Sequence, residues 1–313
     1  MKLIGFGLIL LLMLSCGKQQ EQNAQEIGKR QLKVVATTGM IGDILINLGG
    51  NRLEVTSLMG PGIDPHLYKA SEGDVTRLSS ADIIFYNGLH LEGKMAEVLE
   101  KLESRIKTVA VAKGIPQDLL RSSEAFQGNN DPHIWFDVSL WMKAVDYVSR
   151  QLKEFDPEHA EVYEANHLRY RERLEKLNER ITKILQTVPE DQRVLVTAHD
   201  AFGYFGDAYG FEVRGLQGIS TASETGAADV QNLAKFIVER KIPAIFVETS
   251  VPPRYIEALQ AAVRSRGHEV VVGGSLFSDA MGNPGTAEGT YLGMVKHNVN
   301  TIVRALVQKR LAS

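Results

Sequence analysis

One stretch of the sequence constrains the fold more than any other, because no Gly or Pro occurs between Pro157 and Pro189. Asp156 and Pro157 form a strong helix start, with Asp as the N-cap and Pro at the first helical position. The 32 residues 157–188 would extend about 48 Å as one helix, at ~1.5 Å per residue. An apolar stripe runs along the second half: Leu174, Leu177, Ile181, Ile184 and Val188. We expect one connecting helix over residues 156–189, with a coiled-coil arm as the alternative.

On both sides of this helix, β-type apolar runs alternate with helical patterns. Strands are expected at residues 32–38, 53–59, 82–87, 107–112, 193–198, 211–216, 244–247 and 269–272. Helices are expected to begin at Ser71 and to cover residues 229–240, 253–266 and 288–308. Such alternation favours parallel sheets with helical crossovers. We therefore predict an α/β fold of two similar lobes, each a mostly parallel sheet flanked by helices, over residues 32–155 and 190–313.

Composition excludes several classes of protein. The chain has 313 residues, of which 44% are hydrophobic, so it is not a disordered protein. The net charge is only -3, from 35 basic and 38 acidic residues, which predicts no nucleic-acid partner. A single cysteine permits neither an internal disulfide nor a cysteine-based zinc site. Any bound metal must therefore be held by His, Asp or Glu.

The N-terminus carries the features of an export signal. Lys2 precedes an apolar run over residues 3–14, which is too short for the ~20 residues of a membrane-spanning helix. The segment Met13-Leu14-Ser15-Cys16 resembles a bacterial lipobox, in which the cysteine becomes the lipidated first residue. We predict a signal peptide over residues 1–15, a lipid on Cys16 and a disordered polar linker over residues 16–31. The protein would be exported and anchored to the cell membrane, facing the periplasm or the extracellular side. The alternative is a simple cleaved signal with an incidental cysteine.

Three of the eight histidines stand in a context that favours a metal site. His66 and His133 each follow an Asp-Pro pair in a loop, and His199 follows directly on an expected strand. Asp279 also lies just past a strand. Ligands gather outside the carboxyl ends of strands in open α/β sheets, and two candidates come from each lobe. A metal site in the cleft between the lobes is therefore expected. The other histidines are interpreted as structural: His90, His159, His167, His268 and His297.

These motifs resemble a known family, the metal-specific solute-binding lipoproteins of bacterial ABC importers (the ZnuA/PsaA/TroA family), and TroA in particular. The similarity covers the lipobox, both Asp-Pro-His loops and the long connecting helix, and continues through residues 197–205, 215–221, 276–282 and 289–291. It implies one metal ion bound by His66, His133, His199 and Asp279, and two lobes bridged by a rigid helix. It also implies delivery of zinc or manganese to an ABC permease in the membrane, by a protein that acts as a monomer.

The donor set agrees with this interpretation. Imidazoles and a carboxylate suit Zn²⁺, Mn²⁺ or Fe²⁺, and we expect Zn²⁺ to be favoured, Mn²⁺ to be accepted and Fe²⁺ to be the weakest candidate. Manganese-dedicated members of the family have Glu at the position of His199. Zinc-dedicated members often carry a His-rich loop before the second ligand, which residues 114–130 lack. Asp64, Asp200 and Glu248 are the acidic residues that could orient the imidazoles, although each can equally be a loop cap.

Two other functions are alternatives, an exported zinc hydrolase and a surface adhesin. An exported zinc hydrolase would keep three protein ligands and an open position for water, whereas four ligands close that position. The sequence contains no HExxH motif and no nucleophile elbow, so we predict that the protein is not an enzyme. A surface adhesin is compatible with the lipid anchor, and no feature of the sequence supports it independently.

Overall fold

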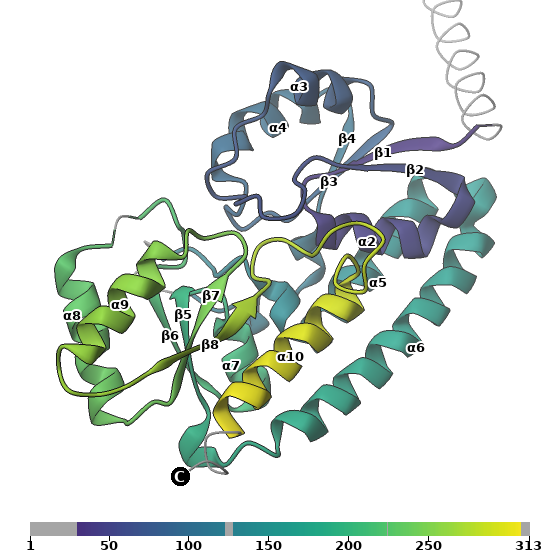
Figure 1. Ribbon diagram of the computed structural model, residues 1–313. Coiled ribbons are helices and arrows are strands. Elements are labelled where there is room, and N and C mark those ends of the chain that lie inside the picture. The colour runs from purple at the N-terminus through teal and green to yellow at the C-terminus, as the bar shows by residue number, and fades with distance from the viewer. Residues whose placement is uncertain (1–29, 123–127, 224, 308–313) are drawn as a thin grey trace, which may run out of the picture.

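The computed structural model describes residues 30–122, 128–223 and 225–307. The predicted signal peptide, Cys16 and most of the linker lie outside the described residues. Within these three ranges, no helix combines the length and the apolar character needed to cross a bilayer. The fold is α/β, with two lobes beside one long helix, as predicted (Figure 1).

The N-terminal lobe is built on a parallel sheet in the order β2-β1-β3-β4. Val34 at the centre of β1 pairs with Val55 on one side and Ile83 on the other. Because helices cover it, the central strand is made almost entirely of buried apolar residues. Helix α3 begins as predicted, since the Ser71 side chain accepts a hydrogen bond from Asp74 N–H and closes a capping box. The elements are β1 (Leu32–Ala36), α2 (Gly39–Gly49), β2 (Leu53–Ser57), α3 (Glu72–Ser79), β3 (Ile83–Tyr86), α4 (Ala96–Glu103) and β4 (Lys107–Ala110).

The C-terminal lobe contains two parallel strand pairs, β5 with β6 and β7 with β8. Strand β5 also lies against β7, so the carboxyl ends of these strands meet on one side. The elements are β5 (Val194–His199), α7 (Gly203–Tyr209), β6 (Glu212–Gln217), α8 (Ala227–Glu239), β7 (Ala244–Glu248), α9 (Arg254–Arg264), β8 (Val271–Leu276) and α10 (Tyr291–Val307). The last strand differs from the expected residues 269–272, because Gly273 and Gly274 belong to it.

The connecting helix α6 spans Ala160–Leu185 and follows a 3₁₀ turn at Pro157–His159. Asp156 is the N-cap residue of this turn and Pro157 its first residue, as predicted, but the Asp156 side chain makes no capping hydrogen bond and α6 ends at Leu185, before residue 189. Its buried carboxylate instead pairs with Arg52 at 2.7 Å and accepts a hydrogen bond from Tyr163. Figure 1 shows α6 running from α2 in the N-terminal lobe to the far end of α10 in the C-terminal lobe.

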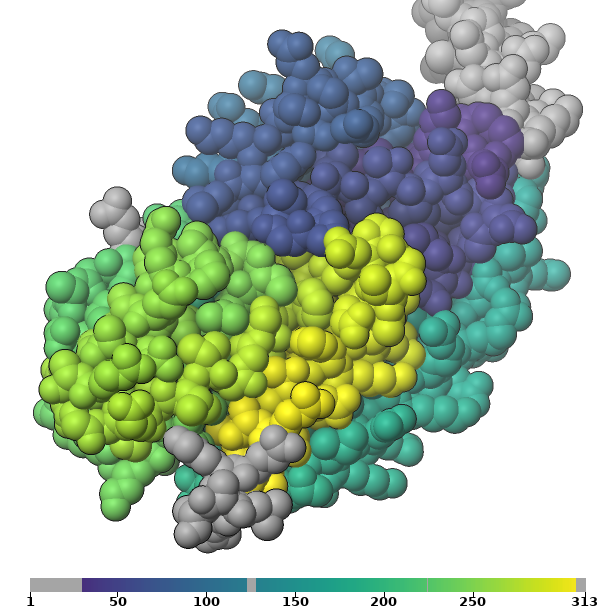
Figure 2. All heavy atoms as spheres, viewed as in Figure 1, coloured from purple at the N-terminus to yellow at the C-terminus, as the bar shows by residue number. Residues whose placement is uncertain are grey.

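Helix α5 (Val138–Phe155) packs along α6 and was not predicted. Asp137 caps it by accepting hydrogen bonds from two backbone N–H groups of the first turn. The main hydrophobic core is continuous from Leu32 in β1, through α5 and α6, to Leu195 in β5 and Leu306 in α10. Figure 2 shows the C-terminal segment lying against the rest of the C-terminal lobe on one side and against the N-terminal segment and α6 on the other. The lobes therefore share a core, which opposes large changes in their relative orientation.

Candidate metal centre

The structure brings together the four residues that the sequence singled out. One ligand atom each from His66, His133, His199 and Asp279 lies within 4.8 Å of the others, and all four residues are buried. His66 lies on the loop after β2, and His133 immediately precedes the 3₁₀ turn before α5. His199 is the last residue of β5, and Asp279 follows β8. Two of the groups come from each lobe, at the carboxyl ends of strands or on the adjoining loops.

The spacing of these atoms matches the coordination of a small divalent ion. His66 Nε2 lies 3.3 Å from His133 Nε2 and 3.7 Å from Asp279 Oδ2. Asp279 Oδ1 lies 3.4 Å from His133 Nε2, and Asp279 Oδ2 lies 3.2 Å from His199 Nε2. Ligand atoms at the corners of a tetrahedron, each ~2.0–2.1 Å from a central zinc, are about 3.3 Å apart. The cluster could therefore hold one metal ion with little rearrangement.

Several of these buried atoms lack a hydrogen bond. His199 Nε2 and both carboxylate oxygens of Asp279 have no hydrogen-bond partner among the described residues, although they lie close together. A buried polar atom without a partner is costly, and a buried carboxylate more so. A cation between the imidazoles and Asp279 would satisfy all three atoms. The chemistry of the donor set and its unpartnered atoms thus fit a metal ion.

Burial and charge act differently on the members of the cluster. Burial lowers the pKa of His66 to about 3, so this imidazole is neutral near pH 7. Burial would also lower the pKa of His133, but the carboxylate of Asp131 raises it to about 9. Burial would raise the pKa of Asp279, but the charges on the neighbouring imidazoles hold it well below its usual range. Asp279 is therefore a carboxylate, the form that binds metal.

Two acidic side chains orient the imidazoles. Asp131 Oδ1 accepts hydrogen bonds from His133 Nδ1 at 2.7 Å and from the backbone N–H of His133 at 2.9 Å. Glu248 accepts from His199 Nδ1 at 2.5 Å and from its backbone N–H at 2.9 Å. Each bond fixes the ring with Nε2 facing the cluster. Glu248 is one of the three acids predicted for this role, whereas Asp131 was not predicted, although it opens the second Asp-Pro-His motif.

The other two acidic candidates have different surroundings. Asp64 accepts from the backbone N–H of His66 at 2.9 Å and from Thr221 Oγ1 of the other lobe at 2.5 Å. It therefore fixes the loop that carries His66 and does not touch the ring. Asp200 follows His199 and is partly buried, and in the described part of the chain no hydrogen bond joins its carboxylate to the imidazoles. It contributes only a nearby charge.

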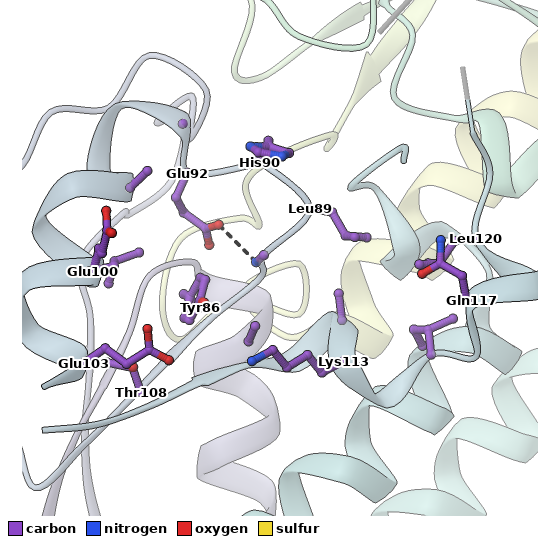
Figure 3. A pocket seen from close by; sticks show the side chains of 17 residues that line it. Tyr86, Leu89, His90, Glu92, Glu100, Glu103, Thr108, Lys113, Gln117 and Leu120 are labelled. Carbon is purple, nitrogen blue, oxygen red and sulfur yellow. Dashed lines mark hydrogen bonds between the residues drawn. The ribbon is translucent and has the colours of Figure 1, made fainter. Parts of the chain in front are cut away.

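The remaining histidines lie away from the cluster. Four of them form hydrogen bonds of 2.7–3.1 Å with residues outside the cluster: His159 with Asp156, His167 with Asp146, His268 with the carbonyl of Ile242, and His297 with the carbonyl of Ser275. His90 lines a cavity of about 570 Å³ between α4 and the ends of β3 and β4. Figure 3 shows this cavity, in which Glu92 turns its carboxylate to the backbone of Gly88. None of the four cluster residues lines it.

The fold and the cluster define a class: two-lobed α/β proteins that enclose a small polar site between their lobes. Residues 34–305 match the family described as zinc-uptake complex component A, periplasmic (ZnuA). The zinc-binding protein TroA of Treponema pallidum is 52% identical over 275 residues, 88% of this chain and 89% of that protein. The manganese-binding lipoprotein MntA of Bacillus subtilis is 49% identical over 293 residues, 93% of this chain and 92% of that protein.

Solved structures show the same similarity. The structure of the periplasmic zinc-binding protein TroA from Treponema pallidum aligns with a TM-score of 0.86, covering 88% of this chain and 99% of that one. The Fe(III)-bound YtgA from Chlamydia trachomatis aligns at 26% identity with a TM-score of 0.80, covering 88% and 98% of the two chains. This chain belongs to the ZnuA family.

Proposed function

We propose that this protein is the extracytoplasmic substrate-binding component of an ABC importer, and that it captures one divalent transition metal ion for a membrane permease. The observation that carries the proposal is the buried cluster of three imidazoles and one carboxylate, with unpartnered atoms at the spacing of metal ligands. The relatives that cover most of this chain are named zinc-binding or manganese-binding proteins. The cargo ion is bound and released unchanged.

In this proposal His66, His133, His199 and Asp279 are the metal ligands. Replacing any one of them with Ala should weaken zinc binding strongly, since a ligand is lost and the remaining groups stay buried. The matched controls are His159→Ala and His268→Ala, because both imidazoles bond only to groups outside the cluster. Competition titration against a chelator of known affinity measures the effect. Wild-type affinity in the ligand variants contradicts the assignment, as does an equal loss in the controls.

The metal preference follows from the donor atoms, since the relatives include both zinc-binding and manganese-binding proteins. Three imidazole nitrogens favour Zn²⁺ over Mn²⁺, and the general order of affinities gives the same ranking. Neither oxygen of Asp279 has a hydrogen-bond partner in residues 30–122, 128–223 and 225–307, so the carboxylate can bind through two atoms and raise the coordination number to five. Such a site accepts Mn²⁺ as well. We infer tight Zn²⁺ binding with weaker, measurable Mn²⁺ binding and still weaker Fe²⁺ binding.

The same donor set argues against a hydrolytic enzyme. Four protein ligands around zinc leave no position for an activated water. Glu248, a candidate general base, already accepts two hydrogen bonds from His199. Purified zinc-loaded protein should show no hydrolase activity. Hydrolysis that disappears in Glu248→Gln while zinc stays bound would contradict this part of the proposal.

Export and anchoring complete the proposal. A signal peptide over residues 1–15 would direct export, and a lipid on Cys16 would hold the protein at the membrane through the linker 16–31. Several relatives are named lipoproteins, which supports this arrangement. A monomer then presents the metal to the permease. We also propose that the N-terminal lobe ends at residue 155 and that the C-terminal lobe begins at residue 190.

A further inference from the structure

A group of polar residues around Asp131, the acid that orients His133, joins the two lobes. Its central member is Arg121. The backbone of Arg121 holds Asp131 in place, since Asp131 N–H donates to the carbonyl of Arg121 at 2.8 Å. Tyr204 in α7 of the other lobe completes the contact. Its hydroxyl donates to the carbonyl of Asp131 at 2.9 Å and accepts from the backbone N–H of Arg121 at 3.0 Å.

The guanidinium of Arg121 adds ionic contacts to this group. Its Nε lies 3.7 Å from Asp131 Oδ2, the carboxylate oxygen that the His133 ring leaves free. Its Nη1 donates to Asp207 of α7 at 2.5 Å. Asp207 is 62% exposed, whereas the side chain of Asp131 is only 2% exposed. Arg121 therefore connects a surface carboxylate of the C-terminal lobe to the buried carboxylate that orients a metal ligand of the N-terminal lobe.

Gly203, the first residue of α7, leaves room for these contacts. A Cβ atom there would lie 2.7 Å from Arg121 Nε and 2.9 Å from Asp131 Oδ2, closer than real Cβ contacts allow. Its backbone is helical, so glycine is not required for conformation, and alanine would favour the helix. The close approach of the ion pair is thus the structural reason for glycine at this position. Helix α7 begins four residues after His199, at the end of β5.

We propose that Arg121 is a positioning residue for the metal site, which fastens the Asp131–His133 ligand loop of one lobe to α7 of the other and thereby slows release of the ion. The inference rests on the proposed function, since it concerns the release of the metal from that site. His133 and His199 belong to different lobes, so an ion can leave when either ring moves. Because α7 begins four residues after His199, holding the Asp131–His133 loop to α7 keeps the two imidazoles together between encounters with the permease.

Substitution of the side chain tests this role while keeping the backbone bonds. Arg121→Met retains the contacts of the Arg121 N–H and carbonyl and removes only the guanidinium. Loss of a group that supports a ligand commonly costs 10–100-fold in affinity. Because Arg121 acts through Asp131, we expect the lower end, about tenfold faster zinc release. Asp207→Asn should accelerate zinc release less. The double variant should release zinc no faster than Arg121→Met, because the two residues act as one pair.

The measurement is stopped-flow release of zinc from the full mature protein into an excess of chelator. A positioning role also predicts that 1 M salt accelerates release in the wild type and not in Arg121→Met, since the ion pair is half-exposed. The melting temperature of the metal-free variant should stay close to that of the wild type. Gly203→Ala should accelerate release as well, although alanine favours the helix.

Arg171→Met is the matched control. Arg171 is exposed to the same degree, 35% against 38% for Arg121, and pairs with Asp146 at 2.6 Å on helices away from the cluster. If the rate of zinc release stays within twofold of the wild type in both Arg121→Met and Gly203→Ala, this inference is overturned and the proposed function is unaffected. The inference is also overturned if Arg171→Met accelerates zinc release as much as Arg121→Met does. It is overturned as well if Arg121→Met loses much of its metal-free stability and salt does not change the release rate of the wild type. A wild-type protein that binds neither Zn²⁺ nor Mn²⁺ contradicts the proposed function itself.

Discussion

Asp279→Asn removes one negative charge from the centre of the cluster with almost no change in shape. Both oxygens of Asp279 lie within 3.7 Å of histidine Nε2 atoms and make no hydrogen bond in the described residues. The carboxylate is therefore free to bind a cation through either oxygen or both. An amide oxygen is a poorer ligand for Zn²⁺, and the amide nitrogen cannot bind it at all.

The expected loss follows from the burial of the site. Removing one partner of a fully buried charge pair costs about 3–5 kcal/mol, and 4 kcal/mol corresponds to roughly a thousandfold weaker binding. Zinc at 100 times the wild-type Kd stabilises the folded protein by about 2.7 kcal/mol, which raises its Tm by roughly 5 °C. At the same zinc concentration the variant would gain less than ~0.1 kcal/mol. Its zinc-induced shift in Tm should therefore vanish.

Thermal unfolding with and without zinc, after exhaustive removal of metal, measures this difference. Asp146→Asn makes the same chemical change on α5, where the carboxylate bonds to Arg171 and His167. Whatever happens to its baseline stability, that control should keep the full zinc-induced shift. A zinc-induced shift of wild-type size in Asp279→Asn would show that the bound ion lies elsewhere and that Asp279 is not a ligand.

Three further predictions concern metal preference, stability and anchoring. Calorimetric titrations should show tighter binding of Zn²⁺ than of Mn²⁺, and His199→Glu should shift the preference toward Mn²⁺; equal or tighter Mn²⁺ binding by the wild type contradicts the ranking. Arg52 and Tyr163 hold the pKa of Asp156 below its usual value against the opposing effect of burial, so their contribution to stability is present above about pH 4 and lost at lower pH. Denaturant unfolding should therefore find Asp156→Asn less stable than the wild type at pH 7, with the difference shrinking as the pH falls below about 4. A difference that stays the same at acidic pH would contradict the ionic role. Cys16→Ser should leave unprocessed precursor or release the protein from the membrane fraction, whereas unchanged fractionation and N-terminal mass would contradict a lipid anchor.

The cluster could be predicted because its signals are local in the sequence. Loop histidines behind proline and acidic groups just past apolar strands mark the carboxyl edge of an α/β sheet, where the topology brings strand ends together. The supporting acids could not be assigned in this way. Asp64 and Asp131 stand in identical Asp-Pro-His motifs, yet Asp131 bonds to the ring of its histidine and Asp64 turns to Thr221. A residue 157 positions away decides the difference.

Contacts between residues far apart in the sequence also explain why some helices and strands differ from the prediction. The helical segment begins at Pro157 behind Asp156, as expected, but Arg52 and Tyr163 engage the Asp156 carboxylate. The first turn is therefore a 3₁₀ turn without a side-chain cap, and the α-helix begins at Ala160. Glycine usually argues against a strand, yet Gly273 belongs to β8. A Cβ atom at this position would lie 2.6 Å from the side chain of Ala305 in α10. Helix packing on the strand, which the sequence does not display, requires the small residue. Helix α5 was missed although its apolar spacing is regular and its cap, Asp137, is a standard one.

The proposed function requires that one metal ion binds between the lobes at the four converging side chains. Anomalous diffraction from crystals of the zinc-loaded protein, recorded on both sides of the zinc absorption edge, locates this ion. One dominant peak is expected about 2.0–2.2 Å from Nε2 of His66, His133 and His199 and from a carboxylate oxygen of Asp279. A protein that carries one equivalent of zinc and shows its strongest peak at any other group would contradict the proposed function.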